Sequence, residues 1–173
     1  RGASCLEGIA LNGASLILDH THDPFSAWAN DGRADYALAS LRKTLPIADG
    51  GVLWSPRHHR LPKAPTLTKE RAAAAEAKMK AMRLKGHYLA GELVSKSDFR
   101  ALATDGEEGI GRGEISGMHP VTTASLASLP IMHWRERRRL NHQLVADGLA
   151  AVKGVRVLSA HAESCPFSAF LIF

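Results

Sequence analysis

Three short apolar segments in the first third of the chain constrain its fold more than any other feature. They lie at residues 15–18, 36–39 and 52–54, and each is too short to form a helix. Residues 16–18 are continuously apolar, a pattern that is typical of a strand covered on both faces of a sheet. Turn-forming residues separate the segments, because Gly and Asn tolerate a positive φ and Pro presets its own φ. The pattern therefore predicts three strands of an α/β sheet.

The composition is that of a soluble globular protein, and it excludes several other classes. Apolar residues make up 45% and charged residues 23% of the 173 residues, a length that suits one domain or one and a half. No window approaches the run of about 18 apolar residues that spans a bilayer, so no membrane span is expected. The formal charge of +5 favours anionic small ligands and falls short of that of a dedicated nucleic-acid binder. The two cysteines, Cys5 and Cys165, are too few for a disulfide framework and favour a reducing, cytoplasmic location.

The middle of the chain predicts a long helix. Thr68 is a good N-cap, and the Ala, Glu, Lys and Met residues that follow it favour a helix to about Leu89. Four apolar residues recur at helical spacing and are expected to form a stripe that faces a core. The stripe consists of Met79, Met82, Leu84 and Leu89.

The rest of the chain alternates between predicted helices and strands. A short helix is expected over residues 97–103, and residues 104–120, with five glycines and several acidic groups, are expected to form an exposed loop. Further along, the pattern predicts helices over residues 121–129 and 132–152, and strands over residues 155–158 and 167–173.

This order of elements predicts an α/β sheet followed by a smaller α+β unit. The chain begins with Arg1 rather than Met and ends inside an apolar run, so we expect it to be a piece of a longer protein. The predicted division is the rear of a large domain over residues 1–65, connecting helices and a loop over residues 66–120, and the start of a small domain over residues 121–173.

Polar functional groups follow the first two predicted strands. Asp19 begins a run of polar residues to Pro24, and Ser40 and Lys43 follow the second strand, before the Gly50–Gly51 turn. Loops at the carboxyl ends of strands in an open α/β sheet converge on a crevice. Asp19 and Lys43, 24 positions apart, are therefore expected to meet there.

These residues carry a resemblance to a known superfamily. An Asp after an apolar strand, a Ser-x-x-Lys after the next and a Gly-Gly turn into a third resemble the large domain of a fold-type I pyridoxal-phosphate enzyme, a three-layer α/β/α fold. The resemblance implies that Asp19 pairs with the protonated pyridine nitrogen and that Lys43 forms a Schiff base with the cofactor. It further implies that Ser40 contacts the cofactor phosphate and that His22 lies beside the phenolic oxygen.

Later segments resemble DegT-type sugar aminotransferases and their class V neighbours. Residues 134–141 resemble the small-domain helix, and residues 154–158 and 166–167 resemble the strands after it. The chain departs from the sugar-enzyme pattern at His22, where Gln is usual, and in the short Ser40-to-Lys43 spacing, which is closer to class V. The resemblance implies transamination between a small-molecule amino donor and a keto or aldehyde acceptor, in a homodimer. It also implies a phosphate-binding helix start, a ring-stacking aromatic and a substrate-carboxylate Arg outside this chain.

Other functions stay open at this point. Desulfurases and lyases share the same core residues, because the cofactor carries the difficult chemistry. Asp19, His20, His22 and Asp23 offer ligand types for a metal-dependent hydrolase, with residues 58–59 as the further candidate ligands.

A non-enzymatic binding module would use the basic residues of the last predicted helix. Arg135, Arg137, Arg138 and Arg139 spread around that helix and are better explained as a solvated face, so no nucleic-acid partner is expected. His20 and Ser26 are expected to be structural, and His58 and His59 to lie in a solvated basic loop.

Overall fold

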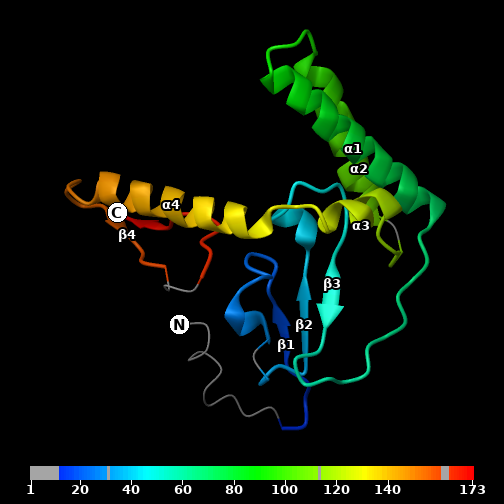
Figure 1. Ribbon diagram of the computed structural model, residues 1–173, viewed down its shortest axis with the longest axis horizontal. Coiled ribbons are helices and arrows are strands. Elements are labelled where there is room, and N and C mark those ends of the chain that lie inside the picture. Colours follow the sequence, from blue (N-terminus) through cyan, green and yellow to red (C-terminus); the bar gives the residue numbers. More distant parts are fainter. Residues whose placement is uncertain (1–11, 31, 113, 161–163) are drawn as a thin grey trace. The chain divides into compact units, whose positions relative to one another are not determined.

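The protein combines helices with small sheets, which is compatible with an α/β class at a coarse level (Figure 1). The computed structural model describes residues 12–30, 32–112, 114–160 and 164–173. Contacts divide the chain into two compact units. The first contains residues up to 44, 52–61 and 130–173, and the second contains residues 45–51 and 62–129. Among the described helices, none is both long enough and apolar enough to cross a membrane.

The first unit contains the three predicted strands, each within two residues of its predicted limits. They are β1 (Ile17–Asp19), β2 (Tyr36–Ala39) and β3 (Val52–Trp54), in the order β1-β2-β3. β1 runs parallel to β2, with Asp19 opposite Leu38, and β2 runs antiparallel to β3. The parallel pairing places the carboxyl ends of β1 and β2 at the same edge of the sheet.

Only one face of this sheet is covered in the described residues. Ala37 and Ala39 are buried, whereas Ile17 is 56% exposed and Leu53 is 41% exposed. The expectation that the first strand is covered on both faces is therefore wrong for the described part of the chain. The period-2 alternation along β2 places its two alanines on the packed face and Leu38 on the open one.

The first unit also contains two short turns, one long helix and a second pair of strands. The short 3₁₀ turn η2 (Ala27–Asn30) follows β1, and η3 (Leu41–Lys43) follows β2. Helix α4 (Ile131–Leu149) crosses near the carboxyl ends of β1 and β2 (Figure 1). Strands β4 (Arg156–Val157) and β5 (Leu171–Ile172) form a separate antiparallel pair.

The second unit is helical. It contains α1 (Lys69–Leu89), α2 (Lys96–Arg112) and α3 (Pro120–Leu126). The predicted N-cap is confirmed, because the hydroxyl oxygen of Thr68 accepts a hydrogen bond from the Arg71 N–H at 3.2 Å.

The buried carboxylate of Asp49 fixes the start of α3. It accepts hydrogen bonds from the His119 N–H at 2.9 Å and from the Thr122 hydroxyl at 2.5 Å. The His119 N–H and the Thr122 hydroxyl, both near the helix start, thereby have a hydrogen-bond acceptor. Gly50 beside it has a φ of +111°, a conformation that an L-residue adopts only with strain.

Helix α2 is longer than the sequence pattern indicates. Residues 104–112, which were expected to be an exposed loop, continue the helix to Arg112. The glycines are tolerated because they lie against α1: a Cβ on Gly106 would lie 2.8 Å from the Ala74 carbonyl oxygen, and one on Gly109 would lie 2.8 Å from the Ala74 Cβ. Close packing of the two helices offsets the low helix propensity of glycine, about 1 kcal/mol per residue.

The same close packing corrects the predicted apolar stripe on α1. Of the predicted stripe, Met79 and Leu84 are half-buried and Met82 and Leu89 are exposed, whereas Ala74, Ala75 and Ala81 are buried. Small side chains bring the backbones of α1 and α2 together, so the helix turns its alanines rather than its long side chains toward its partner.

Substitution of Gly106 by Ala is expected to destabilise the second unit. The new methyl group would meet backbone atoms of α1 at 2.8 and 3.0 Å, and overpacking of this kind costs about 1–3 kcal/mol. Urea unfolding followed by circular dichroism measures the change. Gly111→Ala in the same helix is the matched control, because among the described residues no atom outside its own stretch of helix lies within 4 Å of its Cβ position, and it should stabilise the protein slightly. Equal stability changes for the two variants would contradict the packing account.

Candidate functional site

The structure places the predicted site residues at one edge of the first unit's sheet. Asp19 is the last residue of β1, Ser40 directly follows β2, and Lys43 ends η3. The side chains of Asp19 and Lys43 are exposed, and Ser40 is half-buried. Because β1 and β2 are parallel, the two loops leave the sheet side by side, as the sequence predicts.

Buried Thr21 joins the two strand ends. Its backbone N–H donates to Oδ1 of Asp19 at 2.8 Å, and its hydroxyl oxygen accepts the Ser40 N–H at 3.0 Å. The Thr21 hydroxyl also hydrogen-bonds to the Asp19 carboxylate. This chain of hydrogen bonds links the loop after β1 to the start of η3, and sequence reasoning did not single out Thr21.

The electrostatic environment keeps Asp19 ionised. The side-chain hydrogen bond from Thr21 is the largest cause that lowers the pKa of Asp19 below its ordinary value of 3.8, and the Thr21 backbone hydrogen bond adds to it. Partial burial opposes the shift, and the charges of Lys43 and His22 lower the pKa further. Asp19 and Lys43 are thus close enough for their charges to interact.

This donor set fits the group that the resemblance implies. An ionised carboxylate is the partner that a protonated pyridine nitrogen requires, and an exposed lysine amine can reach an aldehyde. The backbone N–H groups of Thr21 and Ser40 donate to Asp19 and to the Thr21 hydroxyl oxygen, and these hydrogen bonds hold the two loops together. The residues present therefore fit pyridoxal phosphate.

His22 lies at the same edge but has a partner that the sequence did not indicate. Its ring stacks on Phe167 with a centroid distance of 4.7 Å and an interplanar angle of 9°. Phe167 lies in the segment before β5, far along the chain, and no local pattern pairs it with His22. The predicted position of His22 beside the cofactor stays a prediction.

His20 and Ser26 lie in the packing around this edge. His20 is buried, with its ring edge-on to Trp28 at 4.8 Å and 5.7 Å from the Trp54 ring. The hydroxyl of buried Ser26 donates to the Asp23 carbonyl oxygen at 2.9 Å. Both positions agree with the structural roles expected from the sequence.

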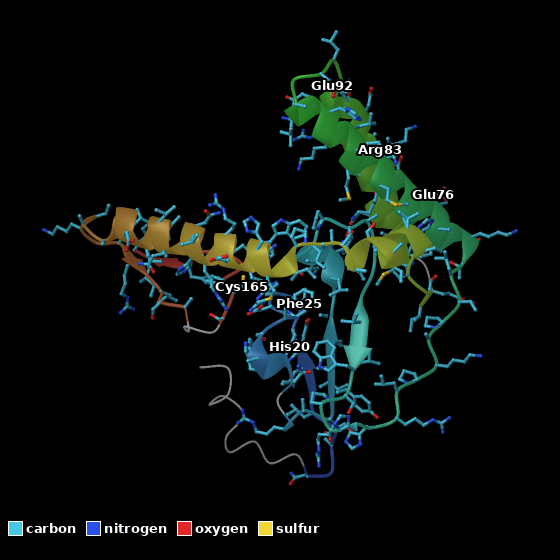
Figure 2. All side chains as sticks on the ribbon, in the orientation of Figure 1. His20, Phe25, Glu76, Arg83, Glu92 and Cys165 are labelled. Atoms are coloured by element: carbon cyan, nitrogen blue, oxygen red, sulfur yellow. The ribbon has the colours of Figure 1, made fainter. Side chains whose placement is uncertain are left out.

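The predicted solvated face of arginines on α4 is wrong at Arg135. Its side chain is buried and pairs with the buried carboxylate of Asp23, which also accepts the Cys165 N–H at 2.8 Å. Figure 2 shows Cys165 directly beneath α4. Removal from water lowers the pKa of Arg135 from its ordinary value. The three residues come from three separate segments, so only the tertiary structure brings them together.

Two further arginines of α4 also bind other segments. Arg138 donates to the Thr44 carbonyl oxygen at 2.5 Å, and Arg139 donates to the Ser164 carbonyl oxygen at 3.0 Å. Arg137 is exposed. The solvated-face interpretation therefore holds for Arg137 and Arg139, which are exposed, and fails for buried Arg135 and half-buried Arg138.

The predicted basic loop after β3 folds back on the sheet. Oδ1 of Asp35 accepts from Arg57 at 2.8 Å and pairs with Nε2 of His59 at 3.0 Å, while Oδ2 accepts the Leu16 N–H at 2.8 Å. The hydrogen bond from the Leu16 N–H and then that with His59 lower the pKa of Asp35, and the positive charge of Arg57 lowers it further. Asp35 precedes β2, so this cluster lies at the amino edge of the sheet, opposite Asp19 and Lys43. His58 and His59 are exposed, as predicted.

The ligands proposed for a metal hydrolase are not gathered at one point. Within the described ranges, no three His, Cys, Asp or Glu side chains are close enough together to hold a metal ion. Asp23 is engaged by Arg135, and His22 stacks on Phe167.

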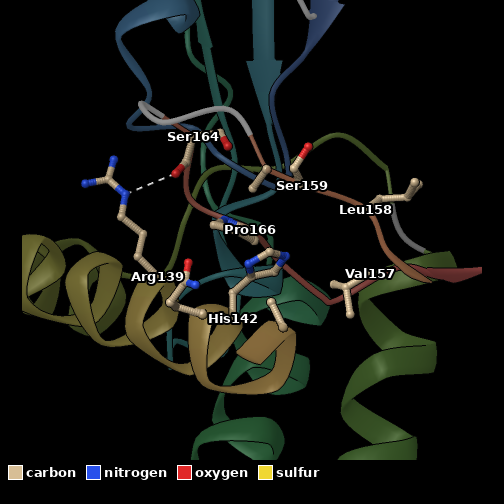
Figure 3. A pocket seen from close by; sticks show the side chains of 10 residues that line it. Arg139, His142, Val157, Leu158, Ser159, Ser164 and Pro166 are labelled. Carbon is tan, nitrogen blue, oxygen red and sulfur yellow. Dashed lines mark hydrogen bonds between the residues drawn. The ribbon is translucent and has the colours of Figure 1, made fainter. Parts of the chain in front are cut away.

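A pocket of about 340 Å³ lies elsewhere in the first unit, between α4 and the strand β4 region (Figure 3). Its walls include His142, Val157, Ser159 and Pro166, and none of the predicted site residues lines it. Figure 3 shows the His142 ring directed into the pocket and the Arg139 guanidinium directed away from it, toward Ser164.

The chain was also compared with known proteins. No family model, curated protein or solved structure matches it.

Proposed function

We propose that the carboxyl edge of β1 and β2 binds pyridoxal 5′-phosphate in an aminotransferase, with Lys43 as the covalent attachment point. One observation carries the proposal: Asp19 ends β1 and exposed Lys43 ends the turn after the parallel strand β2, so both lie at the same edge of the sheet. The hydrogen bonds of Thr21 hold the two loops together there. The finer fold assignment, a pyridoxal-phosphate transferase large domain followed by the start of a small domain, belongs to the same proposal.

Each residue has a specific role in this proposal. Lys43 would hold the cofactor through its amine, which would condense with the aldehyde carbon and release the carbonyl oxygen as water. Asp19 would stabilise the proton on the pyridine nitrogen, because its carboxylate is anionic at neutral pH and the Thr21 N–H holds it in place. Ser40 would contact the phosphate, and His22 would lie beside the phenolic oxygen. When bound, the cofactor supplies an electron sink for the carbanion that forms when a substrate Cα proton leaves.

The proposal includes groups outside this chain. A phosphate-binding helix start, an aromatic that stacks on the cofactor ring and an arginine for the substrate carboxylate would come from the rest of the protein or from a second subunit of a homodimer. The substrates are a small-molecule amino donor and a keto or aldehyde acceptor.

Among the described residues, the environment of Cys165 argues against a role for this cysteine in desulfuration. A cysteine that receives sulfur must be reached by the substrate, but Cys165 is only 4% exposed and its Sγ lies 3.6 Å from the Arg135 carbonyl oxygen. This buried thiol is unsuited to that role.

Reductive trapping tests the attachment point directly. The protein that contains this sequence is incubated with pyridoxal 5′-phosphate, reduced with borohydride and digested. The masses of the peptides are then measured by mass spectrometry. We expect one reduced pyridoxyl group on the Lys43 peptide, and we expect Lys43→Ala to abolish both this adduct and the visible absorbance of bound cofactor.

Exposed Lys63 provides the matched control, because Lys63→Ala removes a lysine from the basic loop without touching the sheet edge. It should leave the adduct unchanged. A stoichiometric adduct that survives in Lys43→Ala, or wild-type protein that forms no adduct at all, would overturn the proposal.

A further inference from the structure

Helix α4 contacts both loops of the proposed site. Arg135, in its second turn, pairs with Asp23 in the loop that begins at Asp19. Arg138, three residues later and therefore on the same side of the helix, reaches the loop that carries Lys43. One turn of a rigid helix thus connects the two loops from outside the sheet.

The contact of Arg138 is directed at the turn that carries Lys43. Thr44 is the C-cap of η3, and its N–H bonds to the Leu41 carbonyl at 3.0 Å, which closes the turn. The Thr44 carbonyl oxygen accepts a hydrogen bond from Nη2 of Arg138 at 2.5 Å. Lys43 itself is exposed, and the Lys43 N–H bonds back to the Ser40 carbonyl at 3.2 Å. A charged donor therefore anchors the backbone one residue from the lysine.

The anchor is well placed to fix the turn. Thr44 and Leu41 are buried, so the turn can move only if it also disturbs packing at the sheet edge. A hydrogen bond from a charged donor is stronger than one between neutral groups, and the planar guanidinium holds its direction. Arg138 is half-buried, which reduces competition by water.

We propose that Arg138 is a positioning residue that sets the direction of Lys43 toward Asp19 by holding the Thr44 carbonyl. This inference rests on the proposed function, because it assigns Arg138 a role in the reaction of Lys43 with the cofactor aldehyde. Arg138 does not touch the cofactor in this account. Its effect is on the rate at which a correctly placed amine reacts, since small displacements of a reacting group are costly.

The test compares Arg138→Met with Arg137→Met in the protein that contains this sequence. Arg137 is the matched control because it is exposed on the same helix. The rate of adduct formation at Lys43 is measured over a range of pyridoxal 5′-phosphate concentrations, by borohydride trapping at successive times. We expect the maximal rate to fall about tenfold in Arg138→Met, with an unchanged half-saturating concentration, and to stay unchanged in Arg137→Met.

Arg138→Lys and hydrogen exchange separate positioning from a general loss of structure. Lysine can donate one hydrogen bond, so Arg138→Lys should recover part of the rate. Amide exchange in residues 41–44 should become faster in Arg138→Met and not in Arg137→Met. The positioning role would be overturned if Arg138→Met had the same maximal rate as wild type, a raised half-saturating concentration, or unchanged amide exchange in residues 41–44. In each of these cases the Lys43 adduct would still support the proposed function. Wild-type protein that forms no adduct would instead remove the proposed function and this inference together.

Discussion

Arg135→Met is expected to lower the free energy of unfolding by about 3–5 kcal/mol, the usual cost of removing one partner from a buried ion pair. The Asp23 carboxylate would stay buried with its charge uncompensated, since its remaining hydrogen bond from the Cys165 N–H does not neutralise it. Met keeps most of the apolar volume of the arginine side chain. The decrease in the free energy of unfolding therefore comes mainly from the lost positive charge. Urea unfolding of the purified protein, followed by circular dichroism, measures it.

A double variant identifies the cause of that loss. Asp23→Asn keeps an oxygen that can accept the Cys165 N–H and removes the negative charge. Arg135→Met combined with Asp23→Asn should therefore be more stable than Arg135→Met alone, although it loses a hydrogen-bonded pair. Arg137→Met, on the exposed side of α4, should change stability by less than about 0.5 kcal/mol. If Arg135→Met matched that small change, the buried pair would contribute nothing to stability.

Asp19→Ala is expected to retain the cofactor adduct at Lys43 and to lower the turnover number about a hundredfold to a thousandfold. That is the range observed when one preorganised electrostatic group is removed from a site. The adduct depends on Lys43, whereas the electron-withdrawing power of the ring depends on the proton that Asp19 stabilises. The measurement is steady-state transamination with a panel of common amino acids as donors, on samples matched for adduct content. Unchanged turnover would reject the role assigned to Asp19.

The pH dependence of the same reaction provides an independent test of Asp19. Hydrogen bonds from Thr21 lower the pKa of Asp19 below 3.8, so the carboxylate stays charged until the pH falls below that value. Thr21→Val removes the hydroxyl that makes the largest contribution and should raise the pKa. The pH at which acid abolishes turnover should therefore move upward in Thr21→Val. A shift downward would contradict the assigned hydrogen bond.

Much of the local structure follows from sequence patterns because it depends on near neighbours. The limits of β2 and β3, the Thr68 cap and the start of α1 lie where turn formers and helix propensity place them. The end of α2 lies beyond its predicted position, because the sequence pattern does not indicate that Gly106 and Gly109 pack against α1. Propensity alone predicts a loop there, and packing between helices overrides it.

In the candidate site, too, local features could be predicted from the sequence and contacts between distant segments could not. The order and spacing of Asp19, Ser40 and Lys43 are visible in the sequence, because strand ends and the turns after them are local features. Their arrangement depends on partners far along the chain. Thr21 joins two loops across the sheet, Phe167 stacks on His22, and Arg138 reaches Thr44 from a helix that begins more than 80 residues later.

The sequence by itself determined which residues end the strands and where the proposed reactive groups lie along the chain. It also determined the short apolar segments that form the strands, through side-chain periodicity and backbone preferences. Only the tertiary structure decided which arginines of α4 face solvent and which are buried. Burial of a charge depends on whether a distant carboxylate or carbonyl meets it, and Asp23 lies 112 positions from the arginine that it neutralises.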